Sequence, residues 1–241
     1  MGGRIYRPEQ SGLLELPEIG RLHIGKKQAG QNGREFPVSV DYFIPAGKYA
    51  GLFEQALGDK PQTIQIIFPT DNEARSCNER YEYRDDRGAL VARGDGRTFE
   101  IWDAQRQKYM PYSVEEYPDI MEQITRNNPT KRGADNWDIV LTLRFIVPAV
   151  RGVVGVWQFS TKGRASSIKN IRESFDAVKA MRGTVTQTVF DLSVQFAKSN
   201  KPGVNSRYPV VSLVANDNRI SEIRDAIAPK ENLSLLLPEK K

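Results

Sequence analysis

Hydrophobic and polar positions alternate along much of this chain, and a period of two predicts a fold built mainly of β-strands. Between Thr188 and Phe196 every second side chain falls on one face, so this strand is expected to be half buried. Residues 141–147 alternate in the same way, and the β-branched run from Thr63 to Pro69 predicts another strand. Further strands are predicted at residues 21–25, 36–45, 154–160 and 208–215.

Residues 78–113 reverse direction at turns rich in Asp and Gly, which predicts a β-meander of three or four strands. In its first strand, Tyr81 and Tyr83 share one face. The opposite face of the same strand carries charged side chains, namely Arg80, Glu82 and Arg84. The meander is therefore expected to present one aromatic face and one charged face.

Helical patterns are fewer than strand patterns. Ser113, with Glu116 three residues later, has the spacing of a capping box and predicts a helix that ends near Asn127. The longest predicted helix covers residues 166–182. Its apolar stripe consists of Ile168, Ile171, Phe175, Val178 and Met181. Short helices are predicted at residues 48–58 and 221–228.

Because strands outnumber helices and the helices lie between groups of hairpins, the pattern predicts an α+β fold with a mixed or mainly antiparallel sheet and two to four helices. Residues 1–19 are expected to be an irregular arm, residues 20–228 a single α+β domain, and residues 229–241 a C-terminal tail. A seam near residues 128–136 leaves two domains as an alternative. Prolines at both ends of segment 36–45 predict that it is not a central strand.

The composition excludes several classes of protein. Of the 241 residues, 39% are hydrophobic and 27% are charged, which is typical of a soluble globular protein. No apolar run approaches the roughly 20 residues of a membrane span, and the N-terminus lacks a signal-peptide pattern. The single cysteine, Cys77, indicates a cytoplasmic protein, and with His23 as the only histidine we expect no zinc site and no cofactor.

Charge is distributed unevenly along the chain. Residues 151–210 hold ten Lys or Arg and three Asp or Glu, so the net charge of this stretch is +7. The rest of the chain has a net charge of −2, which gives the total of +5. Such an excess can attract a polyanion such as DNA, weakly or through a partner protein. It can equally be a solvated face that only keeps the protein soluble, and the sequence leaves both interpretations open.

The junction at residues 160–168 combines two cations with several hydroxyl groups at a predicted helix start. Free N–H groups at a helix N-terminus bind phosphate, whereas Ser166 or Ser167 could equally serve as a plain N-cap. The candidate DNA-binding residues of this region are Lys162, Arg164, Ser166, Ser167, Lys169, Arg172, Lys179 and Arg182. Among them, Lys162, Arg164, Lys169 and Arg172 are expected to contribute most.

Aromatic residues in the meander lie beside arginines, a combination that can stack unpaired bases or contact a protein partner. The alternative is that they form the core of a small sheet, since aromatic residues favour strands. The candidates for stacking are Tyr81, Tyr83, Trp102 and Tyr109. Most carboxylates fall in turns and none has the spacing of a hydrolytic motif, so we expect no catalytic residues and no enzyme activity.

The order of several segments resembles the recombination directionality factors of phages and mobile elements, which partner large serine integrases. The resemblance rests on GRLHIGKK, FPVSVDYFIP, LFEQALGDKPQTIQIIFP, NERYEYRDDRGALVARGDG and VVGVWQFSTKGRASSIKNI, over about residues 20–215. Members of this family are often labelled hydrolases or metal-binding proteins. Phage relatives carry a cysteine cluster after the segment that matches residues 93–96, whereas residues 97–113 here contain no cysteine.

The resemblance implies a binding role and no catalytic residues. It implies that the protein contacts a complex of a large serine integrase with DNA and switches the reaction between integration and excision. A single-stranded DNA-binding or annealing protein of a phage or mobile element is the alternative, because it would share the basic stretch and the aromatic meander.

The first prediction concerns metal. Because one cysteine and one histidine are too few for a Cys/His zinc site, purified protein should contain no stoichiometric zinc. Elemental analysis checks this, and one equivalent of tightly bound zinc would contradict it.

Overall fold

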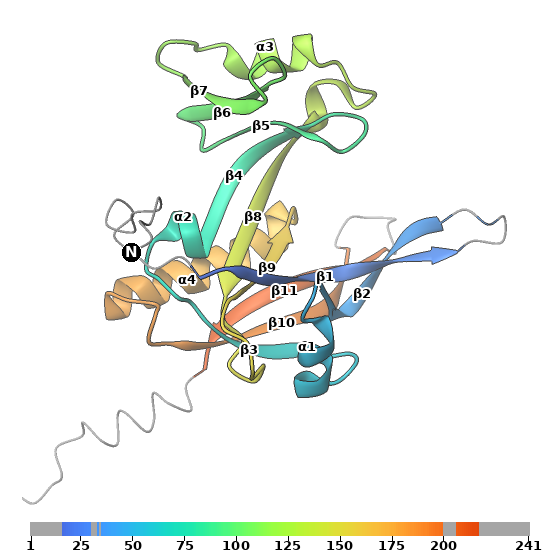
Figure 1. The fold of residues 1–241 in the computed structure, drawn as a ribbon, viewed down its shortest axis with the longest axis vertical. Coiled ribbons are helices and arrows are strands. Elements are labelled where there is room, and N and C mark those ends of the chain that lie inside the picture. Colours follow the sequence, from blue (N-terminus) through green and yellow to red (C-terminus); the bar gives the residue numbers. More distant parts are fainter. Residues whose placement is uncertain (1–15, 30–32, 34, 200–205, 217–241) are drawn as a thin grey trace, which may run out of the picture.

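The computed structural model describes residues 16–29, 33, 35–199 and 206–216, which form two β-sheets and four α-helices (Figure 1). The large sheet has the strand order β2 (Glu35–Ala46), β1 (Glu18–Ala29), β9 (Val156–Thr161), β8 (Trp137–Phe145), β4 (Cys77–Arg84), β5 (Leu90–Gly94), β6 (Thr98–Asp103) and β7 (Lys108–Ser113). The small sheet has the order β11 (Arg207–Ala215), β10 (Val189–Lys198) and β3 (Thr63–Ile67). Among the described strands only β1 and β9 pair in parallel, so the predicted α+β class with a mainly antiparallel mixed sheet is confirmed.

The four helices are short apart from the last. They are α1 (Ala50–Leu57), α2 (Glu73–Ser76), α3 (Ile120–Asn127) and α4 (Lys169–Arg182). A 3-10 turn at Gly133–Asn136 precedes β8, and a π-helical turn at Arg164–Ile168 leads directly into α4. The predicted arm is described only from residue 16, and the predicted helix 221–228 and tail 229–241 lie outside the described residues.

The main core lies between the inner face of β1, β9, β8 and β4 and the layer formed by α4 and the small sheet. Trp157 on β9 is 1% exposed, and its ring lies 5.0 Å from that of Phe53 on α1. Phe68 contacts Phe175 of α4 and Phe190 of β10 edge to face, with ring centroids 5.0 and 5.2 Å away. These rings connect the helix to both sheets and bury the predicted alternating positions of β8 and β10.

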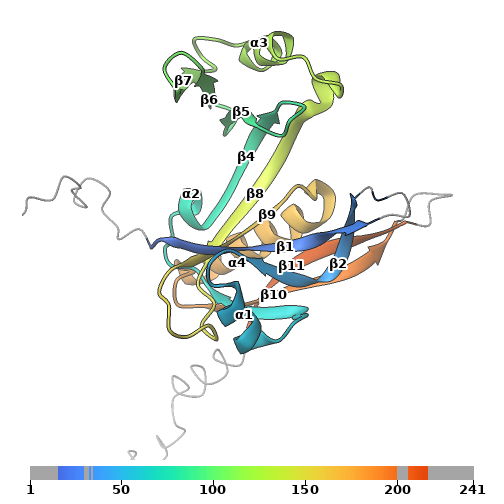
Figure 2. The same ribbon diagram turned by 45° about the vertical axis from the view of Figure 1, so that its right-hand side comes forward.

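A second hydrophobic core lies at the far ends of β4 and β8, away from the first. We call this part of the chain, residues 83–137, the lobe. Its buried residues are Tyr83, Ala92, Phe99, Ile120 and Ile124. Figures 1 and 2 show the lobe projecting from the rest of the molecule, with the long strands β4 and β8 as the connection. The predicted meander is therefore confirmed as strands β4 to β7, and it builds a core of its own.

The start of α3 differs from the sequence prediction. Residues 114–116 and 118–119 form turns, and the helix begins only at Ile120. The hydroxyl of Ser113 accepts a hydrogen bond from the N–H of Glu115, so it closes a local turn instead of capping a helix. Pro118 explains the difference, because the residue before a proline is disfavoured in helical conformation.

The apolar stripe of α4 ends one turn earlier than predicted. Ile171, Phe175 and Val178 are buried, whereas Met181 is 76% exposed. Gly183 adopts a left-handed conformation with φ of 74°, and the chain turns back at this point. As a result Val185, and not Met181, is buried in the core after Val178.

Three of the strands that end a sheet carry prolines. Pro37 and Pro45 lie on β2, Pro111 on β7 and Pro209 on β11. The position of β2 at the sheet edge confirms the prediction for segment 36–45. Because proline has no N–H to donate, each of these edges is a poor template for pairing with another chain.

No helix within the described part of the chain is long and apolar enough to cross a membrane.

The close approach of β1 to Trp157 yields a stability prediction. A Cβ atom at Gly20 would lie 2.3 Å from Cζ3 of the buried Trp157 ring, so Gly20→Ala should lower the free energy of unfolding by about 1–3 kcal/mol. The control is Gly51→Ala in α1, where a Cβ meets nothing within 4 Å and alanine favours the helix. Urea denaturation of both variants is the measurement, and equal midpoints would contradict the prediction.

Candidate functional site

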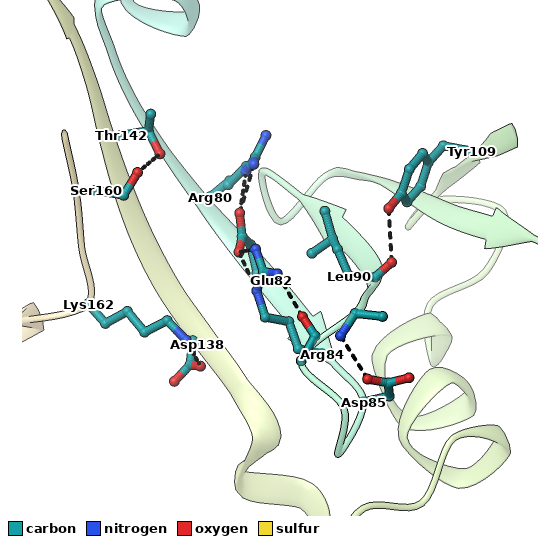
Figure 3. Close-up of polar contacts among 12 residues, drawn as sticks. Arg80, Glu82, Arg84, Asp85, Leu90, Tyr109, Asp138, Thr142, Ser160 and Lys162 are labelled. Carbon is teal, nitrogen blue, oxygen red and sulfur yellow. Dashed lines mark hydrogen bonds and ion pairs between the residues drawn. The ribbon is translucent and has the colours of Figure 1, made fainter. Parts of the chain in front are cut away.

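The outer face of the large sheet is polar, in contrast to its buried inner face. One row across three adjacent strands places Arg21 of β1, Gln158 of β9 and Arg144 of β8 side by side. A second row contains only neutral polar groups, namely Ser160 of β9, Thr142 of β8 and Asn78 of β4. The Thr142 and Ser160 hydroxyls lie 3.0 Å apart (Figure 3). These two rows offer hydrogen-bond donors and contain no carboxylate.

A charged triad on β4 continues this face toward the lobe (Figure 3). The Glu82 side chain is 3% exposed and lies between Arg80 and Arg84. Nε and Nη2 of Arg80 donate to one carboxylate oxygen at 2.9 and 2.7 Å. The same two groups of Arg84 donate to the other oxygen at 3.1 and 2.7 Å. Both guanidinium groups are therefore held in fixed orientations, and the triad keeps a net charge of +1.

The environment of Glu82 keeps its carboxyl group ionised. Burial alone would raise its pKa, but the hydrogen bonds from Arg84 and Arg80 outweigh burial and lower the pKa below its ordinary value. This carboxylate belongs to the structure of the face, since both of its oxygens are already occupied by guanidinium groups.

Two shallow cavities of about 440 and 290 Å³ lie on this face and share Arg80, Thr142 and Gln158, so they form one continuous groove. Seven cations and three anions line it, which gives a net formal charge of +4. The cations are Arg21, Arg75, Arg80, Arg84, Arg93, Arg144 and Lys162, and the anions are Glu82, Asp95 and Glu100. The groove is therefore a basic concave feature of the outer face.

Most of these charges have partners at the rim of the groove. Arg93 pairs with Glu100 at 2.5 Å, and Lys162 pairs with Asp138 of β8 at 2.7 Å. Arg144 is exposed and makes no ion pair or hydrogen bond with the described residues. This guanidinium group is thus available to a ligand without breaking a contact.

An exposed aromatic pair lies at the lobe end of the same face. Trp102 of β6 is 44% exposed, and its ring meets that of Tyr109 of β7 edge to face at 5.2 Å. The Arg93 guanidinium lies 4.8 Å from the centre of the Tyr109 ring. The Tyr109 hydroxyl donates to the Leu90 carbonyl at 2.9 Å and thereby fixes the ring (Figure 3). We call Arg93, Trp102 and Tyr109 the aromatic patch.

The four predicted stacking residues are divided between the lobe interior and its surface. Tyr83 is fully buried, and its hydroxyl donates to the Asn128 carbonyl at 2.6 Å. Tyr81 is half-buried and packs against Phe99. Tyr83 and Tyr81 thus belong to the core of the lobe, as the alternative interpretation of the aromatic residues expected. Trp102 and Tyr109 remain accessible at the surface.

In the segment before α4 that was predicted to bind phosphate, the backbone N–H groups are used in hydrogen bonds within the segment itself. The N–H groups of Ser166 and Ile168 donate to the Gly163 carbonyl, and that of Arg164 donates to the Lys162 carbonyl. Neither serine caps the helix, because the chain enters α4 through the π-helical turn. Ser167 is buried, and its hydroxyl accepts the N–H of Val211, so it joins the π-helical turn before α4 to β11.

The basic side of α4 is largely paired with acids. Glu73 of α2 accepts from Arg172 at 3.2 Å and from Lys179 at 2.6 Å, and these hydrogen bonds lower the pKa of Glu73. Arg182 donates to the Thr188 hydroxyl, and Lys169 lies 3.8 Å from Glu173. Arg164 is exposed. The eight DNA-binding candidates therefore do not form one basic surface, and their contact with DNA stays a prediction.

Cys77 and His23 lie in different parts of the fold. Cys77 is buried in the main core, and burial raises its pKa to about 11. His23 is exposed on β1 beside the groove. Within the described ranges, no three His, Cys, Asp or Glu side chains form a group that could hold a metal ion.

Sequence reasoning identified the charged face of β4 but missed its continuation across β8, β9 and β1. The alternation of Arg80, Glu82 and Arg84 was the visible signal for the charged face of β4. Arg21 and Arg144 gave no such signal, because only the strand order brings them to either side of Gln158.

Comparison with known protein families shows what this chain is similar to. A family model described as Gp3-like, recombination directionality factor-like, matches residues 19–216. No curated protein and no solved structure matches the chain.

The buried triad yields a pH-dependent prediction. Glu82→Gln leaves two guanidinium groups without their carboxylate and should reduce the free energy of unfolding at pH 7 by on the order of 2–3 kcal/mol. Because the pKa of Glu82 is lowered in the folded protein, its contribution is present above the ordinary carboxyl pKa and is lost as the pH falls through the folded value.

The difference between wild type and Glu82→Gln should therefore shrink in acid. Thermal denaturation between pH 7 and pH 3 measures it, with Glu122→Gln on the exposed surface of α3 as the control. A difference that stays constant over this range would contradict the prediction.

Proposed function

We propose that this chain, which belongs to the Gp3-like family of recombination directionality factor-like proteins, binds a large serine integrase on DNA and switches it between integration and excision. The family match over residues 19–216 is the observation that carries the proposal. Membership indicates an accessory role in DNA recombination and implies a recombinase as the partner.

A switch of this kind requires only binding energy. The integrase complex has two arrangements, and a protein that binds one of them more tightly shifts the equilibrium by its difference in affinity. A difference of about 1–3 kcal/mol corresponds to a shift of 5- to 150-fold. The proposal therefore needs a contact surface and no catalytic residues in this chain.

The aromatic patch is the surface that best fits a protein partner. Residues that dominate binding energy at interfaces are most often Trp, Tyr and Arg, and the patch consists of one of each. Tyr109 is already fixed by its hydrogen bond to Leu90 and by Arg93, so it loses little conformational entropy on binding. The exposed Trp102 supplies apolar area beside it.

The place of the patch in the fold also supports this role. Strands β6 and β7 end the large sheet on the projecting lobe (Figure 2). A partner that docks there contacts the lobe without displacing the main core. The carboxylates beside the patch are already committed, since Glu100 pairs with Arg93 and Asp95 accepts the N–H groups of Arg97 and Thr98. This supports a binding role over an enzymatic one.

The test is recombination in a tube with the cognate large serine integrase and paired product sites, with and without this protein. Excision should occur only when the protein is present, and the two proteins should co-purify. No excision above background together with no co-purification would contradict the proposal. Tight, sequence-indifferent binding to single-stranded DNA in that case would favour the alternative class.

The patch itself is tested by substitution. Trp102→Ala should weaken integrase binding by about tenfold or more, because it removes a central aromatic anchor. Tyr208→Ala is the matched control, since Tyr208 is also an exposed aromatic residue on a strand but lies on β11 of the small sheet. Titration calorimetry provides the affinities, and equal effects of both substitutions would argue against the patch.

A further inference from the structure

We infer that the groove on the outer face of the large sheet is a binding site for duplex DNA, which it holds by the phosphodiester backbone without reading bases. This site is distinct from the aromatic patch and from the basic side of α4. The inference rests on the groove itself and does not depend on the proposed integrase contact.

The first argument is the arrangement of donors. Arg21 and Arg144 lie on either side of Gln158 in one cross-strand row, and the next row adds the hydroxyl groups of Thr142 and Ser160. Arginine can form two parallel hydrogen bonds to one phosphate, and hydroxyl and amide groups supply the other contacts that proteins commonly make to DNA backbone.

The second argument is that the cations are arranged in advance. Glu82 is almost completely buried and holds Arg80 and Arg84 with four hydrogen bonds, so both guanidinium groups are already ordered at the groove. One carboxylate cannot neutralise two arginines, and the lining residues carry a net formal charge of +4, which becomes +2 when Glu18 and Asp138, the partners of Arg21 and Lys162, are included. An ordered excess of positive charge lowers the entropic cost of binding a polyanion.

The third argument is the extent of the groove. Its lining extends across β1, β9, β8, β4, β5 and β6, and strands about 4.8 Å apart give a span of about 24 Å. Phosphates of one strand of duplex DNA follow each other every 3.4 Å or so along the axis, so this span matches about seven of them. A single small anion would leave most of the donors unused.

The lining also indicates which polymer fits. No Phe, Tyr or Trp lines either cavity, and His23 is the one ring among the lining residues, whereas successive bases of a single strand need several aromatic platforms on which to stack. Protein interfaces have an apolar centre, whereas this lining is mainly charged or polar. The groove therefore suits a regular row of negative charges, such as the phosphodiester backbone of a DNA duplex.

The test uses the full chain without integrase. Fluorescence anisotropy with a short labelled DNA duplex, at about 50 to 200 mM salt, should show binding whose affinity falls steeply with salt. Arg21→Ala/Arg144→Ala removes two exposed cations from the groove and should lower the salt slope by about two units. Arg126→Ala/Lys198→Ala makes the same charge change on α3 and β10, away from the groove, and should leave the slope unchanged.

Four outcomes would overturn the inference. The first is that the protein does not bind duplex DNA at low salt, and the second is that the two double variants have equal effects. The third is that the salt slope falls only in an Arg164→Ala/Lys169→Ala variant. The fourth is that the protein binds single-stranded DNA more tightly than the duplex. If Arg21→Ala/Arg144→Ala abolished integrase capture while duplex binding stayed intact, the groove would be a protein-binding site instead. Thermal denaturation should first show that each variant is as stable as the wild type.

Discussion

The antiparallel pairing of β4 with β8 is the interaction on which the rest of the molecule depends. Its register runs from Cys77 opposite Leu143 to Tyr83 opposite Trp137. The first pair is buried in the main core, and the second belongs to the core of the lobe. Since side chains alternate along both strands, the same ladder also sets the outer face, where Asn78 lies opposite Thr142. A slip of one residue would exchange the two faces and disrupt both cores together.

A polar network fixes α4 against the start of this ladder. Glu73 precedes β4 and binds both Arg172 and Lys179 of α4. Asp71 accepts the N–H of Val185 and the hydroxyl of Thr184, which follow α4 in the chain. Burial would raise the pKa of Asp71, but these hydrogen bonds lower it overall. The basic residues that the sequence suggested for DNA are thus used in part to join the helix to the sheet.

The sequence predicted those parts of the fold that depend on local periodicity. Strand β8 and the meander follow from alternation alone, because one face of each is buried. The predicted start of α3 was wrong, because a capping-box spacing is only one local signal and Pro118 competes with it. The part of the outer face beyond β4 could not be predicted, because the Arg21–Gln158–Arg144 row depends on a parallel pairing between strands distant in the chain. Likewise, no pattern distinguishes the buried Tyr83 from the exposed Trp102.

The chain enters the lobe through β4 and leaves it through β8, at two positions that face each other in an antiparallel pair. Antiparallel strands can be joined by a turn of two residues, so the geometry of the main core does not require any particular chain between them. Insertions, deletions or replacement of the lobe are therefore compatible with the rest of the fold. In evolutionary terms, the lobe is a module that can be exchanged while the remaining framework stays the same.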